Sequence, residues 1–354
     1  MSTSSMQLPI AITMGDAAGI GPEIIAKAYQ LQPELLQACF VWGDLATMRR
    51  AAALVGKGVP YPVAQIRSAA EALDLPPHCM AVLQEGEPLA QVVWGQVSAT
   101  AGAFAGHCVL AAARAAMRGE VAALVTAPLH KEALSAAGAP FDQFPGHTEM
   151  LQAVAAEHLD KPLGEVPVRM MLANDELRTV LVSIHVSLRA AIEAVTFDNV
   201  LQTLLITHAS LSRVLGRAPR IAVAGLNPHA GEGGLFGREE IDVIAPAMQA
   251  AALQGCQVSG PWAPDTVFMR ARRQVSELAQ EVAKFDVVVA MYHDQGLIPV
   301  KYLGVDKGVN VTLGLPLVRT SPDHGTAFDI AGSGRADHAS LIEAIRMARA
   351  LLVP

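Results

Sequence analysis

Residues 286–293 read DVVVAMYH, a short run of apolar and β-branched side chains that ends at a histidine. Residues 178–185, RTVLVSIH, repeat this pattern, and residues 220–229, RIAVAGLNPH, repeat it with a few loop residues before the histidine. Such short apolar runs are typical of buried strands. Each of the three histidines therefore follows the carboxyl end of a predicted strand.

Short apolar runs alternate with longer Ala- and Leu-rich segments along the whole chain. Strands that alternate with crossover helices form mostly parallel sheets flanked by helices, so the expected fold class is α/β. The predicted strands are residues 9–14, 38–42, 121–126, 168–173, 178–184, 220–225, 286–291 and 309–313. Helical spacing marks residues 197–215 and 241–253, and residues 99–117 are expected to form a buried helix and not a membrane span.

The chain has 354 residues, more than one core usually holds, so two lobes are expected. Their predicted bounds are 1–145 with 311–354, which carry the cofactor loops, and 146–310, which carry the metal ligands and the dimer interface. The net charge of −7 comes with scattered basic residues, which argues against nucleic-acid and membrane partners. Four separated cysteines and an N-terminus without a signal-peptide pattern favour a reducing cytoplasmic location.

His185, His229 and His293 are expected to meet at one rim of the sheet, because ligands of open α/β sheets bind at the carboxyl ends of the strands. Three imidazoles can hold a divalent cation and leave a coordination position open. Nitrogen ligands favour Zn²⁺, Co²⁺ or Ni²⁺, and a substrate carboxylate and hydroxyl would also allow Mg²⁺ or Mn²⁺. Asp294 could orient an imidazole or add an oxygen ligand. The alternative is that each histidine only caps a strand.

Two glycine-containing segments are candidates for cofactor binding. Residues 15–23, GDAAGIGPE, follow the first strand and open a helix, but they lack the GxGxxG spacing. Residues 324–332, HGTAFDIAG, place small residues beside a histidine and an aspartate, which could lie against an adenosine and its ribose. Each segment could instead be a simple helix-leading loop. The residues singled out are Gly15, Asp16, His324, Gly325 and Asp329.

Three further polar residues, Lys301, Asn310 and Arg319, come from the segment between these motifs. An arginine pairs with a phosphate or carboxylate through two parallel hydrogen bonds, and a lysine acts as a point charge. Isolated basic residues are usually solvated surface, so the residues alone leave both interpretations open.

Together these segments resemble the 4-hydroxythreonine-4-phosphate dehydrogenase family from about residue 12 to the C-terminus. The motifs that carry the resemblance are GDAAGIGPEI, PGHTE, GLNPHAGEGG, PDTVF, YHDQG, GVNVTLGLP and RTSPDHGTAFDIAG, in this order. The first and last also resemble the isocitrate and isopropylmalate dehydrogenases, which implies that family's two-lobed fold.

The resemblance implies a homodimer whose active site lies at the lobe cleft and the subunit interface, with NAD or NADP as oxidant and one divalent metal per subunit. It places the metal on His185, His229 and His293, the last supplied by the partner subunit. It assigns the small phosphorylated hydroxy-acid substrate to His147, Thr148, Lys301, Asn310 and Arg319.

The implied reaction is transfer of hydride from the substrate's C3 to the nicotinamide, followed by loss of CO₂. The general base stays open among Lys301, His147 and a water on the metal. Ala17 replaces the family's usual proline, and VSIHVSL and GEGGLFG are closer to relatives that oxidise 4-phospho-D-threonate or 4-phospho-D-erythronate. A third relative oxidises the cis-dihydrodiol of terephthalate, but PGHTE and RTSPDHG favour a phosphorylated substrate.

Two other classes fit part of this pattern. A metal-dependent aldolase or hydrolase acting on a phosphosugar acid would use the same histidines and basic residues without a nicotinamide. A non-catalytic metal- or metabolite-binding protein would keep the ligands and show no turnover.

Overall fold

The computed structural model describes residues 8–57, 59–273, 284–304 and 307–352. The chain divides into two compact units, Met1–Pro167 with Leu315–Leu352 and Val168–Gly314. The first boundary lies later than the sequence predicted, because helix α5 (His147–Leu159) packs against α3 (Ala99–Met117) and so belongs to unit 1.

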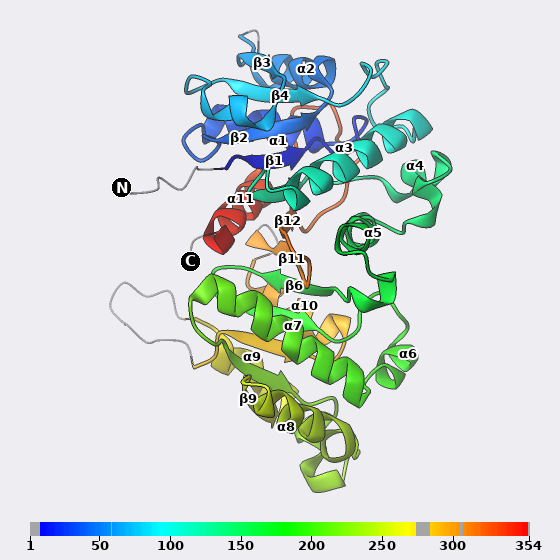
Figure 1. The fold of residues 1–354 in the computed structure, drawn as a ribbon, viewed down its shortest axis with the longest axis vertical. Coiled ribbons are helices and arrows are strands. Elements are labelled where there is room, and N and C mark those ends of the chain that lie inside the picture. Colours follow the sequence, from blue (N-terminus) through cyan, green and yellow to red (C-terminus); the bar gives the residue numbers. More distant parts are fainter. Residues whose placement is uncertain (1–7, 58, 274–283, 305–306, 353–354) are drawn as a thin grey trace. The chain divides into compact units, whose positions relative to one another are not determined.

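Unit 1 is a parallel sheet with helices, ordered β3-β4-β2-β1-β5-β12. Its strands are β1 (Ile10–Thr13), β2 (Cys39–Gly43), β3 (Val63–Ile66), β4 (Met80–Gln84), β5 (Ala123–Thr126) and β12 (Val318–Pro322). Its remaining α-helices are α1 (Gly21–Leu31), α2 (Leu45–Val55), α4 (Lys131–Ala136) and α11 (Ala339–Leu352). Helix α1 packs against α2 and α11, whereas α3 packs against α4 and α5 (Figure 1).

Unit 2 is a mixed sheet ordered β11-β6-β7-β10-β8-β9. Its strands are β6 (Arg169–Ala173), β7 (Arg178–Leu181), β8 (Arg220–Ala224), β9 (Gln257–Trp262), β10 (Val287–Ala290) and β11 (Val309–Leu313). Its α-helices are α6 (Leu188–Glu193), α7 (Phe197–Leu215), α8 (Ala245–Leu253), α9 (Pro264–Ala271) and α10 (His293–Tyr302). Strand β6 is antiparallel to β11 and β7, and β7, β10, β8 and β9 run parallel.

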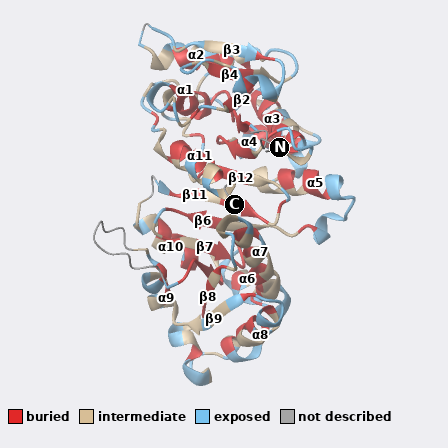
Figure 2. Ribbon diagram, turned by 60° about the vertical axis from the view of Figure 1, so that its left-hand side comes forward, coloured by how far each residue is buried: buried red, intermediate tan, exposed pale blue. Residues whose placement is uncertain are grey.

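The cores of both units lie between strands and helices, and Figure 2 shows the buried residues concentrated there. Strand β1 is buried at every position between β2 and β5, and β10 is equally buried between β7 and β8. Central parallel strands are covered on both faces, which is why their sequences are continuously apolar. No described helix is long and apolar enough to cross a membrane.

The predicted α/β class is confirmed, as are all eight predicted strands and helices α3 and α7. Four strands were missed: β3, β4, β9 and β12. Three of the sequences explain the omission, since β3 is half-exposed, β9 contains Gly260 and Pro261, and β12 reads VRTSP, whereas β4 is the apolar run MAVLQ. The helix predicted at 241–253 begins as a π-helical turn, Glu240–Ile244, followed by α8. Pro246 explains the change, because its ring clashes with the carbonyl four residues earlier in a regular helix.

Candidate active site

Three parallel neighbouring strands of unit 2 end at the predicted histidines. The order β7-β10-β8 pairs Ala290 with Leu181, and Val289 with Val223, so the carboxyl ends of the three strands lie at one edge of the sheet. His185 follows β7, His229 follows β8, and His293 is the first residue of α10 after β10. The three histidines therefore follow strands that end at the same edge of the sheet, and their convergence on one ion stays a prediction.

His185 and His293 lie next to each other, with ring centroids 5.7 Å apart. Both line a cavity of about 400 Å³ together with Ser183, Tyr292 and Asp294. The Oδ1 atom of Asp294 lies 2.7 Å from Nδ1 of His293. A carboxylate on one ring nitrogen fixes the tautomer and leaves Nε2 to bind a metal, which is the orienting role predicted for Asp294.

His229 stands in a loop with unusual backbone geometry. His229, Ala230, Gly231, Glu232 and Gly233 all have positive φ. Left-handed backbone costs non-glycine residues about 1–2 kcal/mol each, so this loop needs external support. The buried carboxylate of Glu240 provides it, since Oε1 accepts the backbone N–H groups of Leu226 and Asn227, each at 2.7 Å. The loop borders a second cavity, of about 630 Å³, which Asp265 and Asp294 also line.

Among the described residues of this single chain, no three His, Cys, Asp or Glu side chains are grouped closely enough to hold a metal ion. The donor chemistry nevertheless fits a divalent transition metal, because a neutral imidazole oriented by a carboxylate is a common ligand for such ions. The exposed rings of His185 and His229 are also accessible. The assignment of the three histidines as ligands stays a prediction.

In unit 1, Arg319 on β12 is a buried cation. Its side chain is 3% exposed, and Nε and Nη2 donate to Oγ1 of Thr126, at the end of the neighbouring strand β5. Burial lowers the pKa of Arg319 to about 10, and the negative charge of Glu149 acts in the opposite direction. The group stays charged at neutral pH and can attract an anion.

His147 begins α5 and faces the same charge. Burial, and secondly the positive charges of Arg319 and Lys131, hold the pKa of His147 well below its usual value, while a hydrogen bond with the Ala127 backbone opposes the shift. The ring is therefore neutral at pH 7. Its buried Nε2 has no hydrogen-bond partner. A buried polar atom without a partner is costly, and a bound polar ligand would satisfy it.

The loop after β1 holds a second buried polar group. Gly15 has φ +73°, and a Cβ there would meet the carbonyl oxygen of Pro128 at 2.4 Å, so the turn requires glycine. Asp16 is fully buried, and Oδ1 accepts the N–H of Ala18 at 2.8 Å, whereas Oδ2 has no partner. Burial raises the pKa of Asp16, although the Ala18 hydrogen bond opposes this.

The two candidate cofactor segments lie side by side in unit 1. Ile20 donates to the carbonyl oxygen of Thr326 at 3.0 Å, and Gly19 leaves no room for a Cβ against Thr326. Phe328 stacks on His130, with ring centroids 4.4 Å apart. The predicted residues His324, Gly325 and Asp329 are exposed on this segment, as a cofactor site would require.

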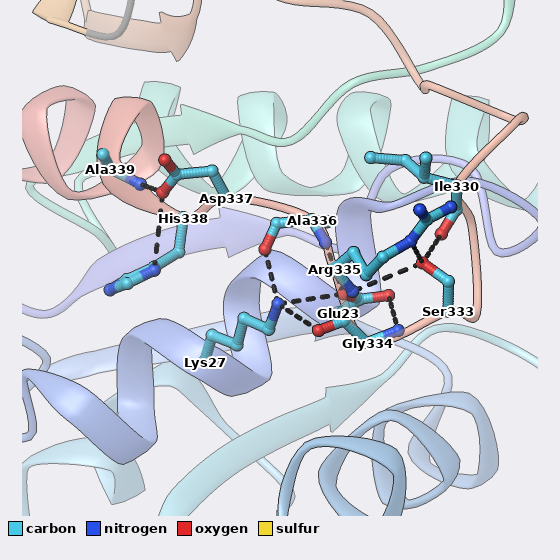
Figure 3. A network of polar contacts seen from close by, with 10 residues as sticks. All are labelled: Glu23, Lys27, Ile330, Ser333, Gly334, Arg335, Ala336, Asp337, His338 and Ala339. Atoms are coloured by element: carbon cyan, nitrogen blue, oxygen red, sulfur yellow. Dashed lines mark hydrogen bonds and ion pairs between the residues drawn. The ribbon is translucent and has the colours of Figure 1, made fainter.

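An ion pair on α1 holds the chain that follows this segment (Figure 3). Glu23 accepts the N–H groups of Gly334 and Ala336, at 3.2 and 2.8 Å, and Lys27 donates to the carbonyl oxygens of the same two residues. The Nζ atom of Lys27 lies 3.1 Å from Oε1 of Glu23. Two side chains one helical turn apart therefore satisfy all four backbone groups, and we call this set the Glu23–Lys27 clamp.

The remaining predicted substrate residues lie on regular elements. Thr148 follows His147 in the first turn of α5, and Arg319 is in the same unit. Lys301 lies in the last turn of α10, and Asn310 lies on β11 opposite Leu172 of β6. Their contact with substrate stays a prediction.

Sequence reasoning missed several residues that shape these sites. They are Glu23, Lys27, Thr126, His130, Glu240, Asp265 and Gln295. Thr126 could have been found as a polar residue that ends an apolar strand, and Asp265 lies within the PDTVF motif. Glu23 and Gln295 likewise lie within the motifs GDAAGIGPE and YHDQG, but they act, like the others, through contacts with residues distant in sequence.

The match to known proteins covers nearly the whole chain. Residues 35–348 match the family model of the pyridoxal phosphate biosynthetic protein PdxA. This chain belongs to the PdxA family. A curated relative from Beijerinckia indica, named 4-hydroxythreonine-4-phosphate dehydrogenase, is 50% identical over 98% of this chain and 96% of its own length.

Two further relatives show that similar proteins are named for different substrates. D-threonate 4-phosphate dehydrogenase of Salmonella typhimurium is 43% identical, over 97% of this chain and 98% of its own length. The crystal structure of 4-hydroxythreonine-4-phosphate dehydrogenase from Klebsiella pneumoniae is 40% identical, with a TM-score of 0.84 over 98% of this chain and 100% of that one. The predicted family and its dehydrogenase class are confirmed.

Proposed function

We propose that this protein oxidises the C3 hydroxyl of a small hydroxy acid phosphorylated at C4, with NAD or NADP as the hydride acceptor. The first candidate substrate is 4-hydroxythreonine 4-phosphate, after the 50% identical relative, and the second is D-threonate 4-phosphate. Both carry a phosphate ester and a hydroxyl, so both place the same demands on the binding residues.

The observation that carries this proposal is that the positive charge of Arg319 acts on His147, so that a cation and a neutral imidazole serve one site. A buried guanidinium supplies positive charge for an acidic group. Since the ring of His147 bonds the Ala127 backbone through its other nitrogen, the partnerless Nε2 of the neutral ring can accept a hydrogen bond. A cation beside an acceptor is complementary to a molecule with an acid group and a hydroxyl.

In the first step, the C3–H bond breaks and its hydride goes to the nicotinamide, while the proton of the C3 hydroxyl goes to a base and a ketone forms. In the second step, the bond between C1 and C2 breaks, CO₂ leaves, and C2 takes up a proton. His147 can accept the hydroxyl proton, since its lowered pKa keeps it neutral. Arg319 holds an acidic group of the substrate in place while the hydride and the hydroxyl proton leave.

His185, His229 and His293 would hold a divalent metal, with Zn²⁺, Co²⁺, Mn²⁺ and Mg²⁺ as candidates. When bound, such an ion supplies Lewis-acid stabilisation of negative charge that develops on oxygen. Asp294 orients the His293 ring for this role, and Glu240 maintains the loop that carries His229.

We further propose a homodimer in which the partner subunit completes the metal site. Exposed apolar side chains next to the metal ligands support this, since Val186 and Leu188 follow His185 and are 53% and 61% exposed. Leu235 and Phe236, beyond His229, are 74% and 49% exposed. Clustered exposed apolar residues mark interaction surfaces. Light scattering coupled to size exclusion should give twice the chain mass.

The test is a steady-state assay at 340 nm of the metal-loaded protein with NAD and NADP. The substrates are 4-hydroxy-L-threonine 4-phosphate, 4-phospho-D-threonate, 4-phospho-D-erythronate and the terephthalate cis-dihydrodiol. We expect cofactor reduction with a phosphorylated acid, and loss of turnover in a folded His229→Ala variant. Turnover without cofactor reduction would favour an aldolase or hydrolase, and activity on the dihydrodiol alone would refute the phosphate assignment.

A further inference from the structure

Gln295 connects two loops that carry metal-ligand candidates. Its side chain is buried in the first turn of α10, with 9% of the residue exposed. Oε1 accepts the N–H of Met291 at 2.7 Å, and Nε2 donates to the carbonyl oxygen of Gly225 at 2.7 Å. The first bond is local and resembles the backward half of a capping box. The second bond joins residues 70 positions apart.

The two backbone groups lie where the histidine-bearing loops begin. Gly225 is the first residue after β8, four positions before His229, and Met291 follows β10, two positions before His293. Beyond Gly225, Glu240 fixes Leu226 and Asn227, so the position of Gly225 is transmitted to the His229 loop. Strands β8 and β10 are paired in the sheet, and Gln295 extends this link beyond the strand ends to the start of the two loops.

The third histidine is connected to the same point. Ser183 donates its hydroxyl to the carbonyl oxygen of Met291 at 3.1 Å, two residues before His185. The backbone of Met291 is thus held by Gln295 through its N–H and by Ser183 through its carbonyl. A short chain of buried hydrogen bonds joins the starting points of all three loops.

The chemistry of the side chain is specific. The position requires an acceptor for one N–H and a donor for one carbonyl at glutamine's reach, and a neutral amide provides both. A glutamate keeps the acceptor but places a second oxygen against the Gly225 carbonyl. A methionine fills the space and leaves both backbone groups without partners.

From these contacts we infer that Gln295 is a positioning residue that sets the spacing of the His229 and His293 loops and thereby the affinity for a divalent metal. The inference rests on the proposed metal site. It holds whether the two histidines bind one ion or, in a dimer with shared sites, two. Residues that orient metal ligands typically change affinity about 10- to 100-fold when they are replaced.

The experiment is a titration of metal-free protein with Co²⁺, whose visible absorption reports the ligand geometry. For Gln295→Met we expect about 10- to 100-fold weaker Co²⁺ binding and an altered spectrum. Gln152→Met is the matched control, because Gln152 in unit 1 also donates from its amide to backbone carbonyls, those of Leu163 and Val166. That variant should bind Co²⁺ as the wild type does.

If Gln295→Met does not fold, Gln295→Glu takes its place, since it keeps the bond to Met291, and the same weakening is expected. Wild-type affinity and spectrum in a folded Gln295 variant would overturn the inference, provided that His229→Ala weakens Co²⁺ binding. If His229→Ala binds Co²⁺ like the wild type, the metal site of the proposed function is wrong, and the positioning role falls with it.

Discussion

The two units solve the same structural problem with different chemistry. In each, side chains in the first turns of a helix hold backbone from a distant part of the chain beside a candidate binding segment. Unit 1 uses the charged Glu23–Lys27 clamp on residues 334–336, and unit 2 uses the neutral amide of Gln295 on Gly225 and Met291. Both sets are largely buried, with Glu23 at 3% and Lys27 at 15% side-chain exposure.

The difference between the Glu23–Lys27 clamp and Gln295 follows from the groups that lie near each of them. A charge pair can satisfy four backbone groups, but burying two charges is costly, and losing one partner leaves the other uncompensated. An amide satisfies two groups and adds no net charge. Gln295 therefore adds no further charge near the three histidines, where the buried Glu240 carboxylate already holds the start of the His229 loop. We therefore expect that disrupting the Glu23–Lys27 clamp mainly lowers the free energy of unfolding, whereas replacing Gln295 mainly weakens metal binding.

The largest effect is expected for Glu23→Leu, which leaves Lys27 buried without its carboxylate and two N–H groups without an acceptor. Breaking one side of a buried pair costs about 3–5 kcal/mol of unfolding free energy. Urea denaturation followed by circular dichroism measures this loss. The double variant Glu23→Leu/Lys27→Met should regain part of the stability, because no charge is then stranded.

The same variants test whether the clamp serves the cofactor segment. Since the clamp holds the chain just after residues 324–332, the folded double variant should bind NADH more weakly, measured by nicotinamide fluorescence.

Equal stability of Glu23→Leu and the double variant would show that charge is not what distinguishes this clamp.

A smaller loss of stability is expected for Gln295→Met. Two buried backbone groups lose partners but no charge is stranded, so the unfolding free energy should fall by about 2 kcal/mol. The same urea experiment measures it beside Glu23→Leu. A loss as large as that of Glu23→Leu would remove the contrast between the two clamps.

What the sequence could predict here was set by local periodicity. The strands β1, β7, β8 and β10 are mostly apolar and buried and were recognised, and the parallel order then placed His185, His229 and His293 at one edge. Edge strands with polar or glycine-proline sequences carry no such signal. The order of the motifs is specific enough that the amino-acid sequence alone indicates the family.

The clamps were not predictable, because their partners are far apart in the chain. Nothing in the sequence near Gln295 indicates Gly225, and nothing near Glu23 indicates Ala336. A glutamine or glutamate early in a helix is commonly a cap. Only the three-dimensional arrangement distinguishes a local cap from a link between distant segments. The same limit applies to the buried guanidinium of Arg319 and the buried Nε2 of His147, which lie on amphipathic or polar stretches.

The next effect concerns Thr126→Val, which removes the hydroxyl that accepts from Arg319 and leaves a buried guanidinium with fewer partners. Hydrogen bonds to charged groups contribute about 1.5 kcal/mol or more, so the unfolding free energy should fall by about that amount. If Arg319 binds the acid group of the substrate, KM should also rise while kcat changes less. Thr126→Ser is the control, since it retains the hydroxyl, and it should behave like the wild type.

The smallest expected effect is a dependence of stability on pH that comes from His147 in unit 1. Like the Glu23–Lys27 clamp, this effect depends on the cost of burying a charged side chain. The pKa of His147 is lower in the folded protein than its usual value of about 6.5, because of burial and the charges of Arg319 and Lys131. Below about pH 6.5 the unfolded chain therefore binds a proton that the folded chain does not, and stability falls as pH falls; above that pH this contribution is constant.

Urea midpoints measured between pH 7.5 and about 5.5 should decline more steeply for the wild type than for His147→Gln, which cannot titrate at this position. His158→Gln is the matched control, because His158 is an exposed histidine at the other end of the same helix α5, and its slope should equal that of the wild type. Parallel slopes for the wild type and His147→Gln would mean that His147 is protonated in the folded protein as readily as in the unfolded chain. Its Nε2 would then be available as the acceptor that the proposed hydroxyl contact requires only above about pH 6.5.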